Sequence, residues 1–318
     1  MKILLTGGAG FIGSNLARFF LEHNAEVVVF DNFATGKPEN LHDIRSQITV
    51  IKDDLRNLDA LRRAMRNIDA VSHQAALGSV PRSVADPQTT HEVNVNGTLN
   101  VLQAMREHQV RRIVFAASSS AYGHQPRSPK TETMTPAPAS PYAVSKLAGE
   151  YYMQAFREVY QIEPVCLRYF NVFGPRQDPN GEYAAVIPRF VAALLHQQPP
   201  IVYGDGEQSR DFCPVFNVCR ANWLALHAPA KQCDGIPINI ACGQATSLNQ
   251  ILQKLQTILN TDINPVYAEE RPGDVKHSLA DLTRARQIIG YKPEIFFEEG
   301  LDRAIEWYMH TLGTQSAT

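Results

Sequence analysis

The chain has 318 residues, and its 30 lysines and arginines nearly balance 32 aspartates and glutamates, leaving a formal charge of −2. Apolar residues make up 44% of the chain, enough to bury a sizeable core, and the length suggests about two domains. The near-neutral balance argues against a nucleic-acid partner held by a broad basic surface. No long stretch is polar and charged enough to indicate disorder.

The five cysteines are odd in number, and no two of them have CxxC spacing. A disulfide framework and a structural metal site are therefore both disfavoured. The N-terminal segment lacks the apolar run of a signal peptide, and no stretch approaches the roughly 20 apolar residues that a membrane span needs. We expect reduced thiols, no metal, no membrane association and a cytoplasmic protein.

Short apolar runs alternate with amphipathic segments of helical length from the N-terminus onward. Runs such as Val27-Val28-Val29-Phe30 are nearly continuous, which is typical of parallel strands covered on both faces. The long connections suit right-handed crossovers, so the pattern predicts an α/β fold with a doubly wound parallel sheet. The candidate strands are Lys2–Thr6, Glu26–Asp31, Ile48–Lys52, Ala70–His73, Arg112–Ala116, Pro164–Arg168 and Pro237–Ile240.

From about Asn171 the chain becomes richer in proline, glycine and polar residues, and its elements become shorter. A helix is predicted over Ile187–His196, and Pro237–Ile240 returns a strand to the main sheet. We therefore expect two interleaved domains: 1–171 plus 217–243 for the sheet, and 172–216 plus 244–318 for a smaller unit. The last residues, from Thr314, are predicted to fray.

A glycine-rich turn follows the first predicted strand and opens a helix. Its GxxGxxG spacing lets backbone N–H groups approach a pyrophosphate, and the helix N-terminus adds partial positive charge. Asp31 ends the second strand, where a carboxylate binds an adenosine ribose and repels a 2′-phosphate, so NAD is favoured over NADP. The turn comprises Gly7, Gly10 and Gly13, with Phe11 and Ile12 beginning the helix.

Tyr142 and Lys146 lie four residues apart in a segment that begins with Pro141, a residue suited to a first helical turn, with Ser140 as candidate N-cap. The i,i+4 spacing puts phenol and ammonium on one face, where the positive charge is expected to lower the tyrosine pKa. The predicted strand at Arg112–Ala116 leads into three serines, 118 to 120, at the sheet rim where ligands bind. Together these side chains predict an acid–base site.

Further motifs run along almost the whole chain: Asp31-Asn32, Asp54-Leu55-Arg56, His73-Gln74-Ala75-Ala76 and Arg168-Tyr169-Phe170-Asn171-Val172-Phe173-Gly174-Pro175. With the glycine turn and the Ser–Tyr–Lys set, the chain resembles the extended short-chain dehydrogenase/reductase family, in its nucleotide-sugar epimerase/dehydratase branch. It is most similar there to the bacterial UDP-N-acetylglucosamine 4-epimerases. The marks are Leu77-Gly78-Ser79-Val80-Pro81-Arg82-Ser83, the segment 176–188 and Arg271-Pro272-Gly273-Asp274-Val275-Lys276-His277-Ser278.

The resemblance implies a Rossmann-type sheet of about seven strands with a smaller α/β substrate-binding C-terminal domain, NAD as cofactor and a UDP-sugar as substrate. Tyr142 is implied as acid–base, Lys146 as its partner, and Ser118 as the hydroxyl that positions the sugar. The implied NAD contacts are Gly7, Gly10, Phe11, Ile12, Gly13, Asp31, Asn32, Asp54, Leu55, Gln74, Ala75, Ala76, Tyr142, Lys146 and Tyr169. The implied substrate contacts are Ser79, Ser118, Ser119, Ser120, Tyr142, Asn171, Ala185, Val186, Tyr203, Arg210, Arg271, Asp274 and Ser278.

The residues after the catalytic hydroxyl discriminate within this branch. Dehydratases and decarboxylases of the family carry an acid there, whereas this chain has Ser119-Ser120-Ala121, which favours epimerisation through a 4-keto intermediate. The resemblance implies that Ser278 stands where the family sets the width of the sugar pocket. A small residue there would leave room for an N-acetyl group, which favours UDP-GlcNAc and UDP-GalNAc. UDP-glucose/UDP-galactose or an N-acetylated uronic acid stay open, as does an NAD-sensing protein without catalysis.

Two positions depart from the family pattern. Pro214 and Asn217 stand where tyrosine and aspartate are frequent, and Asn217 is expected to serve as a helix cap. The resemblance also implies a homodimer, with candidate interface helices in Asp86–His108 and Pro141–Tyr160.

Overall fold

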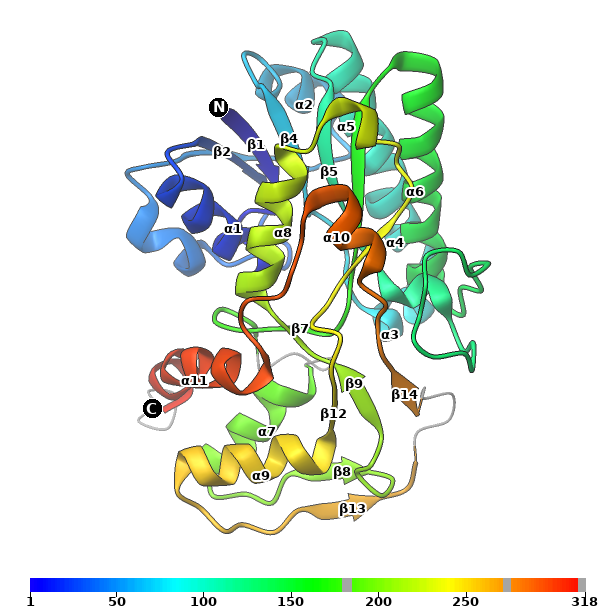
Figure 1. Cartoon of the computed structure of the whole chain (residues 1–318). Helices are drawn as coiled ribbons and strands as arrows, with labels where there is room; N and C mark the ends of the chain where they lie inside the picture. The colour runs from blue at the N-terminus through cyan, green and yellow to red at the C-terminus, as the bar shows by residue number, and fades with distance from the viewer. Residues whose placement is uncertain (179–184, 271–275, 314–318) are drawn as a thin grey trace.

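A computed structural model describes residues 1–178, 185–270 and 276–313. A parallel sheet of seven strands, in the order β11-β6-β5-β4-β1-β2-β3, forms the upper part of the molecule in Figure 1. This order, with the crossover after β3, is that of a doubly wound Rossmann-type sheet, so the predicted fold class is confirmed. The strands are β1 (Lys2–Thr6), β2 (Glu26–Asp31), β3 (Thr49–Lys52), β4 (Ala70–His73), β5 (Arg112–Ser118), β6 (Glu163–Tyr169) and β11 (Ile238–Ile240).

Alternate residues of each strand enter two apolar cores, one on each face of the sheet. Leu5 and Val29 lie in one core, whereas Leu4 and Val28 lie in the other. The first core is covered by α1 (Phe11–Glu22) and α8 (Val215–Leu226), and the second by α2 (Leu58–Ala64), α5 (Gly97–Glu107) and α6 (Pro141–Tyr160). Both faces of the sheet are covered by helices, which explains the continuous apolar runs of the sequence.

Two strands run further than the sequence predicts. β5 continues to Ser118 and β6 to Tyr169, and these two residues are paired across the strands. The strand ends therefore carry polar side chains to the carboxyl edge of the sheet, where α/β folds bind ligands. Shorter elements surround this edge: η1 (Pro38–Ile44), α3 (Val80–Ala85), α4 (Pro87–His91), the π-helical turn η2 (Glu92–Asn96) and η3 (Ser119–Tyr122).

A smaller part lies below the sheet in Figure 1 and consists of short strands and three helices around an aromatic cluster. The rings of Phe173 and Phe297 lie 5.5 Å apart at its centre. The helices are α7 (Val186–Leu195), α9 (Leu248–Leu259) and α11 (Phe297–Gly313). The strands are β7 (Val172–Phe173), β8 (Ile201–Tyr203), β9 (Ser209–Asp211), β10 (Cys213–Pro214), β12 (Ala245–Ser247), β13 (Val266–Ala268) and β14 (His277–Ser278).

The chain crosses between the two parts more than once. α10 (Thr283–Ile289) packs against α8 and β11 of the large sheet, and Leu282 and Tyr291 belong to the core of that sheet. The predicted domain boundary assigned residues 282–291 to the smaller unit, although they pack against the large sheet. The other domain limits stay a prediction. Across residues 1–178, 185–270 and 276–313, no helix combines the length and apolar character that crossing a bilayer requires.

Candidate active site

The glycine turn between β1 and α1 forms a close-packed cradle. Gly7 has a φ of +70°, and a Cβ on Gly13 would lie only 2.0 Å from the carbonyl oxygen of Gly7, so side chains are excluded at both positions. α1 begins after Gly10 without a side-chain cap and without an acid in its first turn. Its first N–H groups are therefore free of intrahelical partners and suit a pyrophosphate. The cradle fits the dinucleotide that the sequence predicts.

Asp31 lies beside this cradle at the end of β2. Its carboxylate accepts hydrogen bonds from the N–H groups of Ala9, at 2.9 Å, and Phe33, at 2.8 Å. Burial raises the pKa of Asp31, while these two N–H groups oppose the rise. The side chain is thereby fixed at the rim of the cradle, where it can meet a ribose hydroxyl.

Three predicted NAD contacts, Asn32, Asp54 and Leu55, follow β2 and β3. Asn32 donates its amide N–H to Asp54 at 2.7 Å, and the Arg56 guanidinium holds the pKa of Asp54 well below its usual range. Leu55 is buried, and its carbonyl accepts a hydrogen bond from Asn100 at 3.0 Å. The structure thus brings Asn32 and Asp54 together beyond β2 and β3.

A second set of hydrogen-bonded polar side chains, Gln74, Tyr169 and Asn222, lies at the ends of β4 and β6. Tyr169 donates its hydroxyl hydrogen to Gln74 at 3.1 Å, and Asn222 of α8 donates to the Tyr169 oxygen at 2.8 Å. The N–H of Ala75 donates to the Thr6 hydroxyl at 3.2 Å. The predicted residues Gln74, Ala75 and Ala76 therefore follow β4 directly beside the cradle.

α6 carries the predicted acid–base pair on its first turns. Ser140 caps the helix by accepting a hydrogen bond from the N–H of Ala143 at 3.2 Å, and Pro141 occupies the first turn, as predicted. Further along, a Cβ on Gly149 would lie 2.4 Å from the Phe115 ring, so glycine lets α6 lie close against β5. This close approach points Lys146 at the end of that strand.

Lys146 is buried, and its ammonium donates to the carbonyl of Ala116 at 2.9 Å. Burial lowers the pKa of Lys146 to about 8, and the nearby carboxylate of Glu150 opposes the shift. Glu150 in turn forms a buried, two-pronged ion pair with Arg168, at 2.7 and 2.8 Å. The ammonium is therefore fixed in place rather than free in solvent.

The pKa of Tyr142 is raised, not lowered as the sequence analysis expects. Burial raises the pKa of Tyr142, and a hydrogen bond with Ser118 is the group that opposes the rise. The ammonium is instead bonded to the Ala116 carbonyl. The sequence shows that the two residues share a helical face, but it cannot show how deeply the phenol is buried.

Ser118 is oriented by its neighbour Ser120. The Ser118 oxygen accepts hydrogen bonds from the N–H of Ser120, at 3.2 Å, and from its hydroxyl, at 2.9 Å. Because both interactions use the oxygen as acceptor, the Ser118 hydrogen stays available for donation. Ser118 can therefore donate to a phenolate at Tyr142 or to a sugar oxygen.

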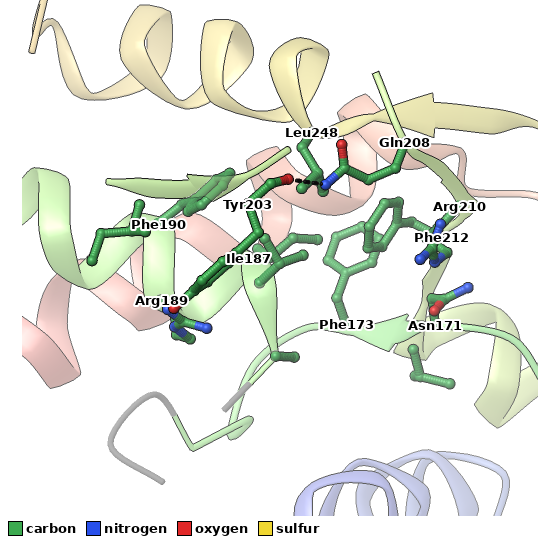
Figure 2. A pocket seen from close by; sticks show the side chains of 14 residues that line it. Asn171, Phe173, Ile187, Arg189, Phe190, Tyr203, Gln208, Arg210, Phe212 and Leu248 are labelled. Atoms are coloured by element: carbon green, nitrogen blue, oxygen red, sulfur yellow. Dashed lines mark hydrogen bonds between the residues drawn. The ribbon is translucent and has the colours of Figure 1, made fainter. Parts of the chain in front are cut away.

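A separate pocket of about 270 Å³ opens in the smaller part of the molecule (Figure 2). Arg210 and Arg189 lie on opposite sides of it, and its lining contains no acidic residue among those that the structure describes. Aromatic and aliphatic side chains form the walls, so the pocket combines apolar surface with positive charge, as a nucleotide requires. It brings together five predicted substrate residues: Asn171, Ala185, Val186, Tyr203 and Arg210.

Several lining residues were missed by the sequence analysis. Gln208 donates its amide N–H to the carbonyl of Tyr203, drawn as a dashed line in Figure 2. Arg189 follows Ile187 and Pro188 in α7, a segment interpreted from sequence only as a helix. The signal available in the sequence was the charge of Arg189 next to an apolar stripe of the helix, which would have marked it as a candidate ligand contact. The missed residues are Val172, Phe173, Ile187, Arg189, Phe190, Ile201, Gln208, Phe212 and Leu248.

The other predicted substrate residues lie outside this pocket. Ser79 caps α3 by accepting from the N–H of Arg82 at 3.2 Å, and α3 packs against α6. Ser119 and Ser120 form η3, which also packs against α6. Ser278 is paired with Arg210 across β14 and β9. Arg271 and Asp274 fall outside the described residues.

The departure at Asn217 has a structural explanation. Asn217 does not cap α8, which begins after Pro214, so that expectation is wrong. Its buried amide instead donates to the carbonyl of Ile295 at 2.6 Å and accepts from the N–H groups of Glu294, at 3.1 Å, and Ile295, at 3.2 Å. Asn217 thus ties α8 to the segment that leads into α11.

Residues 3–241, which include the cradle and the Ser–Tyr–Lys set, match the NAD dependent epimerase/dehydratase family. The chain belongs to this family. It is 38% identical, over 96% of its length and 97% of the relative's, to a putative UDP-glucose 4-epimerase of Methanocaldococcus jannaschii. NAD is therefore its cofactor, and the cradle and Asp31 are suited to hold it.

Two solved structures resemble the whole chain. A UDP-N-acetylglucosamine 4-epimerase from Methanobrevibacter ruminantium, in complex with UDP-N-acetylmuramic acid, is 40% identical, covers 98% of both chains and has a TM-score of 0.92. A UDP-glucose 4-epimerase from Thermotoga maritima, with UDP-glucose, is 36% identical, covers 98% of this chain and 100% of the other, and also has a TM-score of 0.92. Both likenesses extend across the cofactor site and the arginine-lined pocket.

Proposed function

We propose that the enzyme interconverts UDP-GlcNAc and UDP-GalNAc. It is an NAD-dependent UDP-sugar 4-epimerase, and the proposal concerns the sugar and the roles of individual residues. The uridine diphosphate is assigned to the pocket between Arg189 and Arg210, and the hexose to the space toward Tyr142 and Ser118. Two guanidinium groups and an apolar wall support this assignment, because they match phosphate oxygens and a flat base.

The proposed chemistry uses two side chains of α6 and one at the end of β5. Tyr142 takes the proton of the sugar 4-hydroxyl, Ser118 donates a hydrogen bond to the same oxygen, and the ammonium of Lys146 favours the phenolate. Bound NAD supplies the exchange of a hydride with sugar C4 in both directions. The pocket keeps hold of the diphosphate while the 4-keto sugar turns over and presents its other face at C4. Tyr142 then returns the proton to the 4-oxygen as the hydride returns to C4.

The residues beside Ser118 support epimerisation over elimination. η3 contains Ser119, Ser120 and Ala121, and no carboxylate follows the catalytic hydroxyl. Without an acid positioned there, loss of water from the 4-keto sugar has no general acid or base to assist it. The intermediate is therefore reduced again.

The observation that carries the choice of sugar is the position of Ser278. β14 pairs it with Arg210, so a small side chain stands next to the residue assigned to the diphosphate. The family resemblance implies that this position sets the width of the sugar pocket, where a small residue leaves room for an N-acetyl group. The Methanobrevibacter relative is named for UDP-N-acetylglucosamine and was solved with another N-acetylated UDP-sugar.

Replacing Ser278 with tyrosine tests this proposal. We expect kcat/KM for UDP-GlcNAc to fall by at least about 100-fold, since one clash of a few kcal/mol suffices, while kcat/KM for UDP-glucose changes little. Ser46→Tyr, at an exposed serine after η1, serves as the matched control. Equal losses on both sugars, or no loss, would contradict the role of Ser278.

A second candidate substrate is UDP-glucose, favoured by the names of the Methanocaldococcus and Thermotoga relatives. The chemistry at Tyr142 is the same for both sugars, so only the pocket distinguishes them. If UDP-glucose is the substrate, wild-type kcat/KM for UDP-glucose exceeds that for UDP-GlcNAc, and Ser278→Tyr leaves it unchanged.

A further inference from the structure

The carboxylate of Asp211 is fully buried at the end of β9, directly after Arg210. It accepts three backbone hydrogen bonds, from the N–H groups of Cys242 at 2.8 Å, Gly243 at 2.9 Å and Ala280 at 3.2 Å. A buried charge is costly unless several donors surround it. This carboxylate has such donors, and they come from different parts of the chain.

The donors belong to two segments that leave different sheets. Cys242 and Gly243 follow β11 of the large sheet, whereas Ala280 follows β14 of the smaller part. On the far side of the second segment, the N–H of Lys130 donates to the carbonyl of Leu279 at 2.7 Å. Asp211 therefore joins the large sheet to the strand that carries Ser278.

The backbone of Asp211 adds a third connection. Asn171, which follows β6, donates its side-chain N–H to the Asp211 carbonyl at 3.2 Å. Arg210 precedes Asp211 in the chain, and Asn171 bonds to the Asp211 backbone. Ser278 is paired with Arg210 and lies two residues before Ala280, which donates to the Asp211 carboxylate. Arg210, Asn171 and Ser278 are three of the residues assigned above to the UDP-sugar.

We propose that Asp211 is a positioning residue that holds the diphosphate and sugar contacts in register. Burial raises the pKa of Asp211 to about 6, while its N–H partners oppose the rise. Burying this carboxylate therefore costs free energy that an apolar residue would not cost. Buried charged groups of this kind are best attested where they specify one arrangement of segments. The inference rests on the proposed site of the UDP-sugar.

Asp211→Asn removes the charge without changing the shape, and it turns an amide N–H₂ toward backbone donors. We expect the Kd of UDP itself, measured by calorimetry on the NAD-loaded enzyme, to rise about tenfold or more, because hydrogen bonds to a charged group are lost. KM for UDP-GlcNAc should rise in parallel while kcat stays within about threefold, since Tyr142 and Lys146 lie on α6 and Ser118 on β5, away from β9.

Asp205→Asn is the matched control. Asp205 is an exposed aspartate of the same part of the molecule and accepts one backbone hydrogen bond, from Glu207 at 2.9 Å. UDP affinity and KM should stay at wild-type values in this variant. Using UDP as the probe separates this test from the choice of sugar, because UDP affinity falls in Asp211→Asn whichever hexose is turned over.

A second variant, Ala280→Pro, removes one N–H donor and leaves the carboxylate intact. We expect a smaller rise in the Kd of UDP, again with NAD content unchanged and kcat nearly so. A lower melting temperature with unaltered UDP affinity and KM, in either variant, would overturn the proposal. Failure of both variants to fold would also overturn it, since Asp211 would then be purely structural.

Discussion

At the scale of single residues, proton transfer in the proposed reaction depends on the phenol of Tyr142. Replacing Tyr142 with phenylalanine removes the only proton-transfer atom of that side chain while keeping its ring. We expect kcat to fall by about 10²–10⁴-fold, the range typical of general acid–base groups, with UDP affinity and NAD content retained. Product formation followed by NMR gives the measurement.

The control for this variant is Tyr267→Phe, at an exposed tyrosine of β13. It removes a hydroxyl of the same kind away from α6. Undiminished turnover in Tyr142→Phe, or an equal loss in the control, would remove Tyr142 from its proposed role.

The buried ammonium of Lys146 gives a prediction about pH. Its pKa is lowered from 10.5 to about 8 in the folded protein, so the folded state binds the proton less well than the unfolded state. Below pH 8 the charge is present in both states and burial costs free energy. Between pH 8 and 10.5 this cost disappears, and stability rises.

Lys146→Met removes this titration. The free energy of unfolding of wild type, relative to the variant, should therefore increase by about 2–3 kcal/mol between pH 7 and pH 10. Urea denaturation of protein freed of nucleotide measures the difference at each pH. A difference that is constant with pH would contradict the lowered pKa.

Asp211 shows why residue roles were only partly predictable. The glycines, Asp31 and the Tyr–Lys pair stand in local patterns whose sequence context and family resemblance predict their roles. Asp211 bonds to Cys242 and Ala280, which lie 31 and 69 residues further along the chain. No local sequence pattern predicts partners at such distances along the chain. The depth of burial that raises the Tyr142 pKa cannot be predicted from a local pattern either.

At the scale of secondary structure, the contact between α6 and β5 controls the site. Gly149→Ala would place a methyl group 2.4 Å from the Phe115 ring, so the helix must move away from the strand. We expect a loss of about 1–3 kcal/mol in the free energy of unfolding. Turnover should fall as well, because Tyr142 and Lys146 move with the helix.

Gly78→Ala is the control, since a Cβ there meets nothing within 4 Å. Its stability should stay within about 0.5 kcal/mol of wild type, as for ordinary surface changes. Equal stability of the two variants would show that α6 does not need glycine against β5.

The elements of the large sheet were predictable because buried parallel strands are continuous apolar runs. Ile48 and Pro237 were predicted to begin strands that begin one residue later, and helix Ile187–His196 is observed as Val186–Leu195. The small sheets were not predicted. Their strands have two or three residues and pair across long separations, such as Arg210 with Ser278, so they have no periodicity to detect.

At the scale of the whole molecule, the charge of −2 is compatible with anionic ligands. A helix N-terminus and two pocket arginines supply positive charge where the phosphates are assigned, so the rest of the surface needs none. Broad electrostatic attraction is not required for binding.

We propose that the enzyme is a homodimer whose interface contains α6, as the resemblance implies, together with α3, which precedes the other predicted segment, Asp86–His108. These helices pack together and expose valines and a tyrosine, which a second copy would cover. Sedimentation should give twice the chain mass, and Val84→Lys combined with Val159→Lys should give a monomer. A monomeric wild type at micromolar concentration would contradict the proposal. The exposed residues are Val80, Val84, Val144, Tyr151 and Val159.

The most direct test of the central claim is an NMR time course of the wild-type enzyme with UDP-GlcNAc and, separately, UDP-glucose. We predict that UDP-GlcNAc is converted to an equilibrium mixture with UDP-GalNAc, with the larger kcat/KM of the two substrates and no net consumption of NAD. Formation of UDP-galactose from UDP-glucose without any UDP-GalNAc from UDP-GlcNAc would contradict the account.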